Sequence, residues 1–215
     1  MNLIFFGPPG GGKGTQARLM AARRGFPQIS TGDILREAIA AGRALGQQAR
    51  RYMDAGDLVP DGVMVGLIQA RLDRPDARGG FVLDGFPRTL PQAEALEPML
   101  AAMERHIDRA VEFRIDEETV IRRLSGRRVC RAGGHIYHVE FVPPRREGIC
   151  DLDGSPLMQR DDDRPEVIRR RMEVYAREIP PVLDFYRTRG LLAALDASGD
   201  EETVYARLQE VLRTT

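Results

Sequence analysis

The 215-residue sequence contains no tryptophan, only two cysteines and a single lysine, Lys13. Two cysteines are too few for the disulfide framework of a small secreted protein. No window holds eighteen apolar residues, and no basic segment followed by a long apolar run begins the chain. Neither a membrane span nor a signal peptide is therefore expected, and the sequence favours a cytoplasmic protein without a membrane partner.

An excess of charge is missing as well, because 32 Lys plus Arg residues balance 32 Asp plus Glu residues. A global positive field of the kind that attracts nucleic acid is thereby excluded, and no nucleic-acid partner is expected. For any single arginine in so arginine-rich a chain, a solvated surface charge is as good an interpretation as a ligand contact. The length allows one core with a small insertion.

Short apolar runs alternate with helix-like stretches along the chain. The runs are NLIFFG (2–7), PQIS (27–30), GFVLDG (80–85), AVEFRI (110–115) and LLAALD (191–196). Almost wholly apolar runs are typical of strands that are buried on both faces. Strands that alternate with helices predict a parallel sheet with right-handed crossovers, and hence an α/β fold.

Capping residues mark the expected helix boundaries. The predicted N-terminal caps are Ser30, Thr89, Asp116 and Asp163, and the predicted ends are Gly25, Gly42, Gly56 and Gly126. The last helix has Pro165 in its first turn, and we expect Pro180-Pro181 to kink or divide it.

Two segments depart from simple alternation. Residues 30–59 form a helical excursion between strands, whereas residues 127–160 contain short β-like pieces and frequent turn residues. We therefore expect a core of residues 1–29, 60–126 and 161–215. Residues 127–160 would form a small β-rich insertion.

The densest motif is GPPGGGKG, residues 7–14, directly after the first apolar run. It places Gly7, Gly12 and Lys13 on the pattern G-x-x-x-x-G-K, with Gly14 and then Thr15 where one Ser or Thr is usual. Glycines let backbone N–H groups turn inward, and the following helix presents its positive N-terminus to phosphate. Lys13 can then reach the β- and γ-phosphates of a nucleoside triphosphate. A glycine-rich turn that binds nothing is the alternative, but strand, loop, lysine and helix occur in the required order.

The run GFVLDGFPR ends its strand at Asp84, where P-loop proteins place an acidic group near Mg²⁺ or its water shell. A strand-end aspartate that only caps a turn is the alternative. Proximity to the glycine-rich loop favours the magnesium interpretation.

Together with further motifs, these stretches resemble adenylate kinases over essentially the whole chain. The matching motifs are GPPGGGKGTQ (7–16), QISTGDILR (28–36), GFVLDGFPRTLPQA (80–93), GRRVC (126–130), YHVEFVPP (137–144) and QRDDD (159–163). The resemblance implies a P-loop three-layer α/β fold with a central five-stranded parallel sheet. A helical NMP-binding flap, residues 30–59, would cover AMP, and a long lid, residues 127–160, would close over ATP. It further implies a monomer that transfers a phosphoryl group from ATP·Mg²⁺ to AMP, giving two ADP.

The resemblance also assigns roles to the residues at matching positions. The catalytic cations would be Lys13, Arg88, Arg123, Arg160 and Arg171. ATP would contact Gly10, Gly11, Gly12, Lys13, Gly14, Thr15, Arg123, Arg127, Ile136, Tyr137 and Gly199. AMP would contact Thr31, Arg36, Asp57, Leu58, Val59, Gly85, Phe86, Pro87, Arg88, Gln92, Arg160 and Arg171. Asp33 and Asp84 would hold waters of the Mg²⁺ shell, and Asp162 and Asp163 would order lid arginines.

Two of these assignments carry structural conditions. Arg123 and Arg127 are four residues apart and would share a face if their helix persisted through Gly126. The Gln92 amide suits an adenine edge, which offers one donor and one acceptor. Gln92 also fits a capping box with Thr89, and both interpretations can hold.

Metal-bearing lids of this family carry two C-x-x-C-like pairs. Here the pairs are CRAG and CDLD, so Gly133 stands where a second cysteine would be and Asp153 takes the fourth place. His135 could complete a set of Cys130, His135, Cys150 and Asp153, which suits tetrahedral zinc. A metal-free lid with reduced thiols and a disulfide between the two cysteines remain as alternatives.

Two other activities compete with this interpretation. The nearest is a kinase of UMP, CMP or GMP that uses the same machinery. A different class is a P-loop regulatory ATPase whose cysteine-bearing insertion binds a partner or nucleic acid. The insertion lacks interleaved aromatic residues and a strong positive excess, which disfavours the second alternative.

Overall fold

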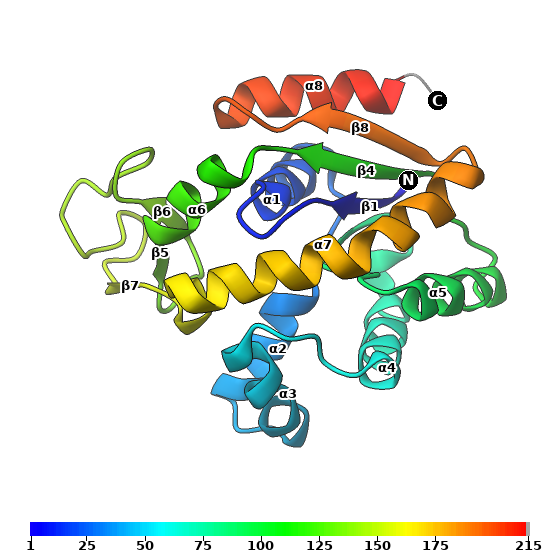
Figure 1. Cartoon of the computed structure of the whole chain (residues 1–215), viewed down its shortest axis with the longest axis horizontal. Helices are drawn as coiled ribbons and strands as arrows, with labels where there is room; N and C mark the ends of the chain where they lie inside the picture. The colour runs from blue at the N-terminus through cyan, green and yellow to red at the C-terminus, as the bar shows by residue number, and fades with distance from the viewer. Residues whose placement is uncertain (214–215) are drawn as a thin grey trace.

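A computed structural model describes residues 1–213 of the chain, with a parallel five-stranded sheet at its centre (Figure 1). Across the sheet the strands are β2 (Gln28–Ser30), β3 (Phe81–Asp84), β1 (Asn2–Phe6), β4 (Arg109–Arg114) and β8 (Leu192–Asp196). Every neighbouring pair is parallel. The five predicted strands and the α/β P-loop fold class are therefore confirmed.

Helices cover both faces of the sheet, and β1 contributes alternate side chains to two apolar cores. Ile4 and Phe6 face the core that includes α4 (Asp61–Leu72), α5 (Leu90–Ala102) and α7 (Pro165–Thr188). Leu3 and Phe5 face the core that includes α1 (Lys13–Arg24) and α8 (Glu201–Arg213). Because successive side chains of a strand point to opposite faces, both faces of β1 are buried. Each such side chain contributes roughly 1.5–3 kcal/mol by leaving water, which explains the unbroken apolar run.

Residues 30–59, here called the helical segment, fold into α2 (Thr31–Ala40) and α3 (Ala44–Ala55). Ser30 caps α2, because its Oγ accepts a hydrogen bond from the Asp33 N–H at 3.2 Å. The two helices approach each other so closely at Gly46 that a Cβ there would lie 2.3 Å from the Ala38 backbone. Glycine is thus required for this helix–helix contact. Gly56 ends α3 with a φ of 76°, as predicted.

Residues 127–160, here called the inserted segment, form a second, antiparallel sheet at one end of the molecule (Figure 1). Its strands are β5 (Arg127–Cys130), β6 (Ile136–His138) and β7 (Leu157–Met158), with β5 in the middle. It follows α6 (Glu117–Ser125) and is followed by the 3₁₀ turn η2 (Asp161–Asp163). A second 3₁₀ turn, η1 (Pro75–Ala77), precedes β3.

Most predicted helix boundaries are confirmed, but Asp163 is not the cap of α7. Arg164 precedes the first turn and makes no side-chain cap, while the Asp163 side chain is buried. The two prolines do not divide α7, which runs unbroken from Pro165 to Thr188. Pro180 and Pro181 lack the N–H that a helix needs at each position. Burial of the neighbouring Ile179, Val182 and Leu183 in the apolar core stabilises the helix despite these missing hydrogen bonds.

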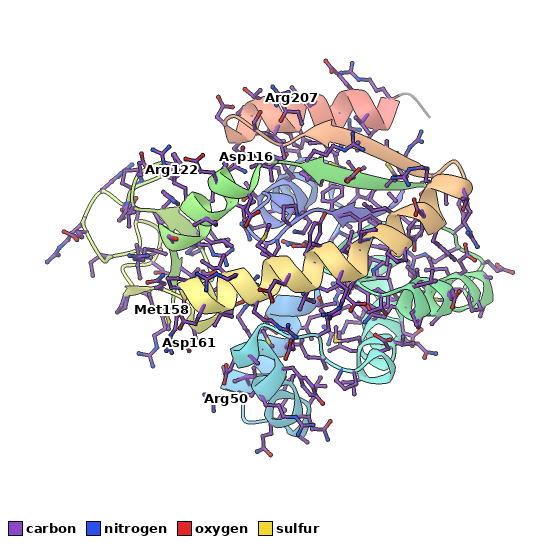
Figure 2. All side chains as sticks on the ribbon, viewed as in Figure 1. Arg50, Asp116, Arg122, Met158, Asp161 and Arg207 are labelled. Atoms are coloured by element: carbon purple, nitrogen blue, oxygen red, sulfur yellow. The ribbon has the colours of Figure 1, made fainter. Side chains whose placement is uncertain are left out.

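Side chains fill the space between the sheet and its helices, whereas charged residues such as Arg50 and Arg207 lie on the outside (Figure 2). Among residues 1–213, no helix combines the length and apolar character needed to cross a bilayer.

Candidate active site

A cavity of about 1060 Å³ opens at the carboxyl edge of the central sheet. Its walls come from the loop after β1, the helical segment, the turn after β3, the inserted segment and α7. Every nucleotide-site residue predicted from the sequence lines this cavity, with the exception of Phe86. The Phe86 side chain is buried in the apolar core instead, so only its backbone is available to a ligand.

The loop after β1 closes around the Lys13 ammonium. Lys13 Nζ donates hydrogen bonds to the carbonyl oxygens of Gly7 and Pro8, both at 2.7 Å. Gly10 and Gly12 have φ values of 76° and 88°, a backbone conformation that other residues seldom adopt. The pKa of Lys13 is lowered to about 8, chiefly by burial, with the charge of Asp84 opposing the decrease and nearby arginines contributing to it.

Four arginines that line the cavity, Arg36, Arg88, Arg160 and Arg171, lie close enough to affect one another. Burial lowers the pKa of Arg88 to about 10, and the neighbouring Arg171 guanidinium acts in the same direction. Burial also lowers the pKa of Arg160 to about 10, with Arg36 as the largest charge contribution. Guanidinium groups that are desolvated and close to one another favour any anion that enters between them.

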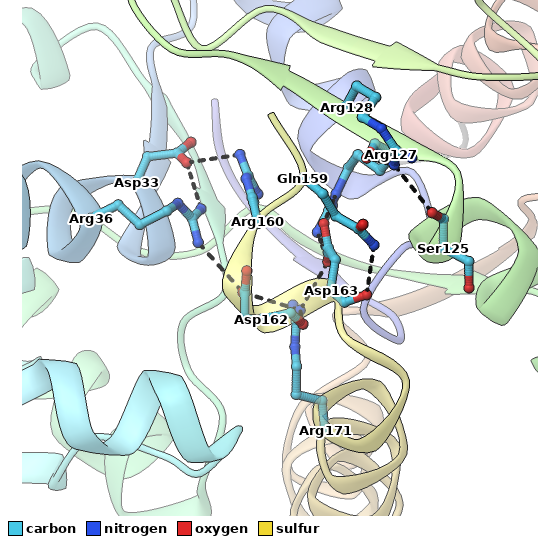
Figure 3. A network of polar contacts seen from close by, with 10 residues as sticks. All are labelled: Asp33, Arg36, Ser125, Arg127, Arg128, Gln159, Arg160, Asp162, Asp163 and Arg171. Atoms are coloured by element: carbon cyan, nitrogen blue, oxygen red, sulfur yellow. Dashed lines mark hydrogen bonds and ion pairs between the residues drawn. The ribbon is translucent and has the colours of Figure 1, made fainter. Parts of the chain in front are cut away.

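Carboxylates contact several of the arginines at the cavity (Figure 3). Asp163 is 0% exposed and accepts a hydrogen bond from Arg127 Nε at 2.8 Å. Asp162 Oδ2 lies 3.1 Å from Arg171 and 3.7 Å from Arg36. Asp163 thus pairs with Arg127, an arginine of the predicted lid, as expected. The ion partners of Asp162 are instead Arg171 of α7 and Arg36 of α2.

Arg123 and Arg127 do not share a helix face, because the helix does not persist through Gly126 as that arrangement required. Helix α6 ends at Ser125 with Gly126 as its cap, and Arg127 opens β5. Both side chains nevertheless line the cavity. Arg123 Nη2 lies 3.2 Å from the carbonyl oxygen of Gly199, to which it donates.

The turn after β3 brings three predicted AMP residues together. Thr31 Oγ1 donates to the Gly85 carbonyl at 2.9 Å, and Arg88 Nε donates to the same oxygen at 2.8 Å. Gly85 has a φ of 84°, and a Cβ there would lie 2.8 Å from both side chains. A side chain at this position would therefore displace Arg88 from the cavity.

Two carboxylates at the cavity provide oxygen ligands of the kind that Mg²⁺ and its waters prefer. Asp84 Oδ2 accepts a hydrogen bond from Gln28 Nε2 at 3.0 Å. The Asp33 side chain is 43% exposed and lies 2.6 Å from Arg36. Burial alone would raise the Asp33 pKa, but Arg36 and Arg160 lower it overall, so Asp33 stays ionised at neutral pH.

Arg18 was not among the predicted site residues, but it also lines the cavity. Burial lowers the pKa of Arg18, and the charges of Asp33 and Asp84 oppose that effect. Arg18 follows Gly14 by four residues on α1, so it projects from the same helix face as the loop's last glycine. That spacing was the available signal.

The four predicted metal ligands of the inserted segment lie together. One ligand atom each of Cys130, His135, Cys150 and Asp153 falls within 4.8 Å of all the others. Cys130 Sγ lies 3.1 Å from Asp153 Oδ2, and His135 Nδ1 lies 3.2 Å from Cys150 Sγ. Both cysteines are free and buried, so the disulfide alternative is wrong.

Two matched turns present the cysteines. The turns CRAGG and CDLDG each close with a hydrogen bond of 3.0 Å from the N–H of the fifth residue to the cysteine carbonyl. The fifth residues, Gly134 and Gly154, have φ values of 65° and 72°. Burial alone would raise the pKa of Cys150, but Tyr137 and backbone donors lower it overall.

The His135 side chain packs beside Gly133, the position in CRAGG where a second cysteine would stand in a metal-bearing lid. A Cβ at Gly133 would lie 2.3 Å from Cε1 of His135. The imidazole of His135 therefore occupies the space into which a side chain at position 133 would project. This packing explains how a histidine two residues later reaches the other three ligands.

A glycine-rich loop between the central strand and a helix, with buried cations around one large cavity, defines a P-loop nucleotide-binding protein. The family model "Adenylate kinase" matches residues 5–191. The chain is 49% identical to "Adenylate kinase" of Archaeoglobus fulgidus, over 99% of this chain and 98% of that protein. It is 50% identical to "Adenylate kinase" of Salinispora tropica, over 100% of this chain and 99% of that protein. A third relative of the same name, from Acidothermus cellulolyticus, is 50% identical over 99% of this chain and 98% of its own length.

The chain belongs to the adenylate kinase family, and it is a phosphotransferase of that family. The predictions of family, fold class and enzyme class are therefore confirmed. The comparisons do not favour a kinase of UMP, CMP or GMP, nor a P-loop regulatory ATPase.

Proposed function

We propose that the protein transfers the terminal phosphoryl group of ATP to AMP, giving two ADP, inside the cavity at the sheet edge. The observation that supports this proposal is the group of desolvated cations around one cavity, with Lys13, Arg88 and Arg160 the most perturbed. Two nucleotides bring several phosphate charges together, and further charge gathers on the equatorial oxygens of the transferring group. Positioned cations in a site that excludes water stabilise that charge.

On the ATP side, the loop at residues 10–15 would hold the triphosphate through its backbone N–H groups and Lys13. Arg123 and Arg127 would contact the same phosphates. The adenine of ATP would lie near Ile136, Tyr137 and the Gly199 backbone, all of which line the cavity.

On the AMP side, Arg36 and Arg88 would bind the α-phosphate, because one guanidinium group can donate two parallel hydrogen bonds to phosphate oxygens. Thr31, Gln92, residues 57–59 and residues 85–87 would surround the nucleoside, and Arg160 and Arg171 would reach the transferring group. An oxygen of the AMP phosphate attacks the γ-phosphorus while the bond from that phosphorus to the bridging oxygen breaks, which releases ADP. AMP phosphate is already anionic, so no strong general base is required.

A bound Mg²⁺ would neutralise phosphate charge, and Asp33 and Asp84 would hold its waters. The donor set fits this ion, because both residues offer carboxylate oxygens at the cavity wall. Within the chain, the helical segment would be the NMP-binding flap and the inserted segment the ATP lid. Residues 1–29, 60–126 and 161–215 would form the core.

For the inserted segment we propose a structural zinc ion held by Cys130, His135, Cys150 and Asp153. Two thiols, one imidazole and one carboxylate within 4.8 Å fit the small tetrahedral shell of zinc. Metal analysis of native protein, purified without chelator or histidine tag, should find about one zinc per chain. Less than about a tenth of a metal per chain would remove this proposal.

We further propose a cytoplasmic monomer, which two free and buried thiols support, because reducing compartments keep thiols free. Light scattering should then give a mass near the chain mass of 24.0 kDa.

The activity is tested by measuring ADP formation from ATP and AMP with Mg²⁺, with UMP, CMP and GMP as alternative acceptors. AMP should be the preferred acceptor. Transfer to another monophosphate at equal efficiency would reassign the substrate. ATP hydrolysis without transfer to AMP would instead favour a P-loop ATPase.

A further inference from the structure

Both polar atoms of the Gln92 amide are held by other parts of the protein. Gln92 Oε1 accepts a hydrogen bond from the Arg88 N–H at 2.8 Å, and Gln92 Nε2 donates to Asp61 Oδ1 at 2.7 Å. Thr89 Oγ1 donates to the same Asp61 oxygen at 3.0 Å. Gln92 is 2% exposed, yet it lines the cavity. The amide is thus a fixed part of the cavity wall.

These contacts permit only one orientation of the amide. A carboxylate only accepts hydrogen bonds, and a backbone N–H only donates them. Rotating the Gln92 amide by 180° would set its oxygen against the Asp61 carboxylate and its NH₂ against the Arg88 N–H. Two hydrogen bonds would be lost and two repulsive contacts would replace them.

The fixed amide retains one free N–H and one free oxygen lone pair for a ligand. A 6-aminopurine such as adenine accepts at N1 and donates from its 6-amino group, which matches this pair. A 6-oxopurine such as hypoxanthine donates from N1 and accepts at O6, which is the reverse. An amide that could rotate would serve both bases, whereas an amide held by Asp61 serves only the first.

We propose that Asp61 is a positioning residue that fixes the Gln92 amide and thereby selects a 6-aminopurine monophosphate over a 6-oxopurine monophosphate. This inference rests on the adenine contact of Gln92 assigned in the proposed function. Asp61 is the first residue of α4 and lies behind Gln92, outside the cavity lining. It acts on the base through Gln92.

The test compares kcat/KM for AMP with kcat/KM for IMP, using ATP and Mg²⁺ as the common donor. Asp61→Ala should lower the AMP:IMP ratio at least ~10-fold, because only the Arg88 N–H then opposes rotation of the Gln92 amide. Asp61→Asn has the same size and should give a smaller decrease, because its amide can pair with either orientation of Gln92. Glu117→Ala is the matched control, since Glu117 is the exposed first residue of α6 and likewise places a negative charge at a helix N-terminus. It should change the ratio by less than about twofold.

An unchanged AMP:IMP ratio in Asp61→Ala and Asp61→Asn would overturn the proposal. An equal loss of kcat/KM for both nucleotides would also overturn it, because that result is expected of a purely structural residue. Circular dichroism establishes whether each variant folds, and the isosteric Asp61→Asn variant serves if Asp61→Ala does not.

A double-variant cycle separates this proposal from the assignment on which it rests. In a Gln92→Ala background, Asp61→Ala should change the ratio no further, because Asp61 acts through the missing amide. If Gln92→Ala alone leaves the ratio unchanged in an enzyme that phosphorylates AMP, the adenine contact of Gln92 fails. If Gln92→Ala lowers the ratio and Asp61→Ala does not, only the role of Asp61 fails.

Discussion

Lys13 should lose its proton near pH 8 in the nucleotide-free protein and regain it when a triphosphate binds. Burial lowers its pKa from the ordinary 10.5 to about 8. Bound phosphates would place several negative charges beside Nζ, and opposite charge favours the protonated ammonium. Nucleotide binding above pH 8 is therefore expected to take up protons from the buffer.

The uptake follows from the pKa of about 8. At pH 8.5 a group with that pKa is about three-quarters deprotonated, so binding should take up roughly 0.75 proton per ATP. At pH 7 the same group is about nine-tenths protonated, and its uptake falls to about 0.1. ATP itself is fully ionised at pH 8.5 and does not obscure the effect. Calorimetric titrations in two buffers of different ionisation enthalpy measure this number.

Because Lys13 is the only lysine, selective ¹³Cε-lysine labelling yields one signal for the whole chain. That signal should titrate near pH 8 in the free protein and at a clearly higher pH with MgATP. Lys13→Arg is the control for the calorimetry, because arginine stays protonated throughout this range and the uptake should vanish. A free-protein midpoint near the ordinary value of 10.5 would refute the argument that burial dominates at this ammonium.

The same shift affects stability with a defined sign. The folded pKa lies below the unfolded pKa, so the unfolded chain binds more protons between pH 8 and 10.5. The contribution of Lys13 to the free energy of unfolding therefore rises with pH across that window. The rise is at most about 3–4 kcal/mol, and screening by water in the cavity reduces it.

Three further outcomes are expected. Asp163→Asn, which removes a fully buried charge from two arginines, should lower the free energy of unfolding by about 3 kcal/mol. Asp161→Asn in the same turn, with a 74% exposed side chain, should change it by less than about 0.5 kcal/mol, and equal losses in denaturant titrations would contradict the burial argument. Gly133→Ala should reduce zinc affinity at least ~10-fold in a chelator competition, because a Cβ would collide with a histidine ligand. Gly66→Ala, where a Cβ meets nothing within 4 Å, should retain the zinc affinity of the parent protein. Equal zinc affinities of the two variants would count against the metal site. Arg88→Ala should lower kcat roughly 100-fold or more, and an effect confined to KM would exclude a transition-state role.

The central sheet could be predicted from local pattern because each strand is buried on both faces. The residues of β1 carry that signal themselves, whatever the rest of the chain does. The glycine loop is equally local, since loop, lysine and helix are consecutive. Most of the predicted nucleotide-site residues stand in short motifs, whereas others, such as Arg123, Arg171 and Gly199, lie outside them and were assigned by position along the chain.

Two features could not be predicted because they depend on residues far apart in the sequence. Asp163 has the sequence features of a helix cap, but its partner Arg127 lies 36 positions earlier, and pairing with that buried guanidinium prevails over capping. The contact of Asp61 with Gln92 joins two helices across 31 positions, and no pattern in the residues next to either one predicts it. Periodicity and capping rules describe residues near in sequence, so they cannot identify such pairs.

The arrangement of partners around the cavity indicates where an incoming anion gains most. Asp162 and Asp163 face Arg171, so a phosphate that binds there exchanges one negative partner for another. Lys13 and Arg88 instead donate to backbone carbonyls, which carry only partial charge. Burial accordingly lowers the pKa of Lys13 to about 8 and that of Arg88 to about 10. A phosphoryl group beside these two would place a full negative charge next to cations whose hydrogen bonds go to backbone carbonyls, and this gain increases as negative charge builds on the transferring group.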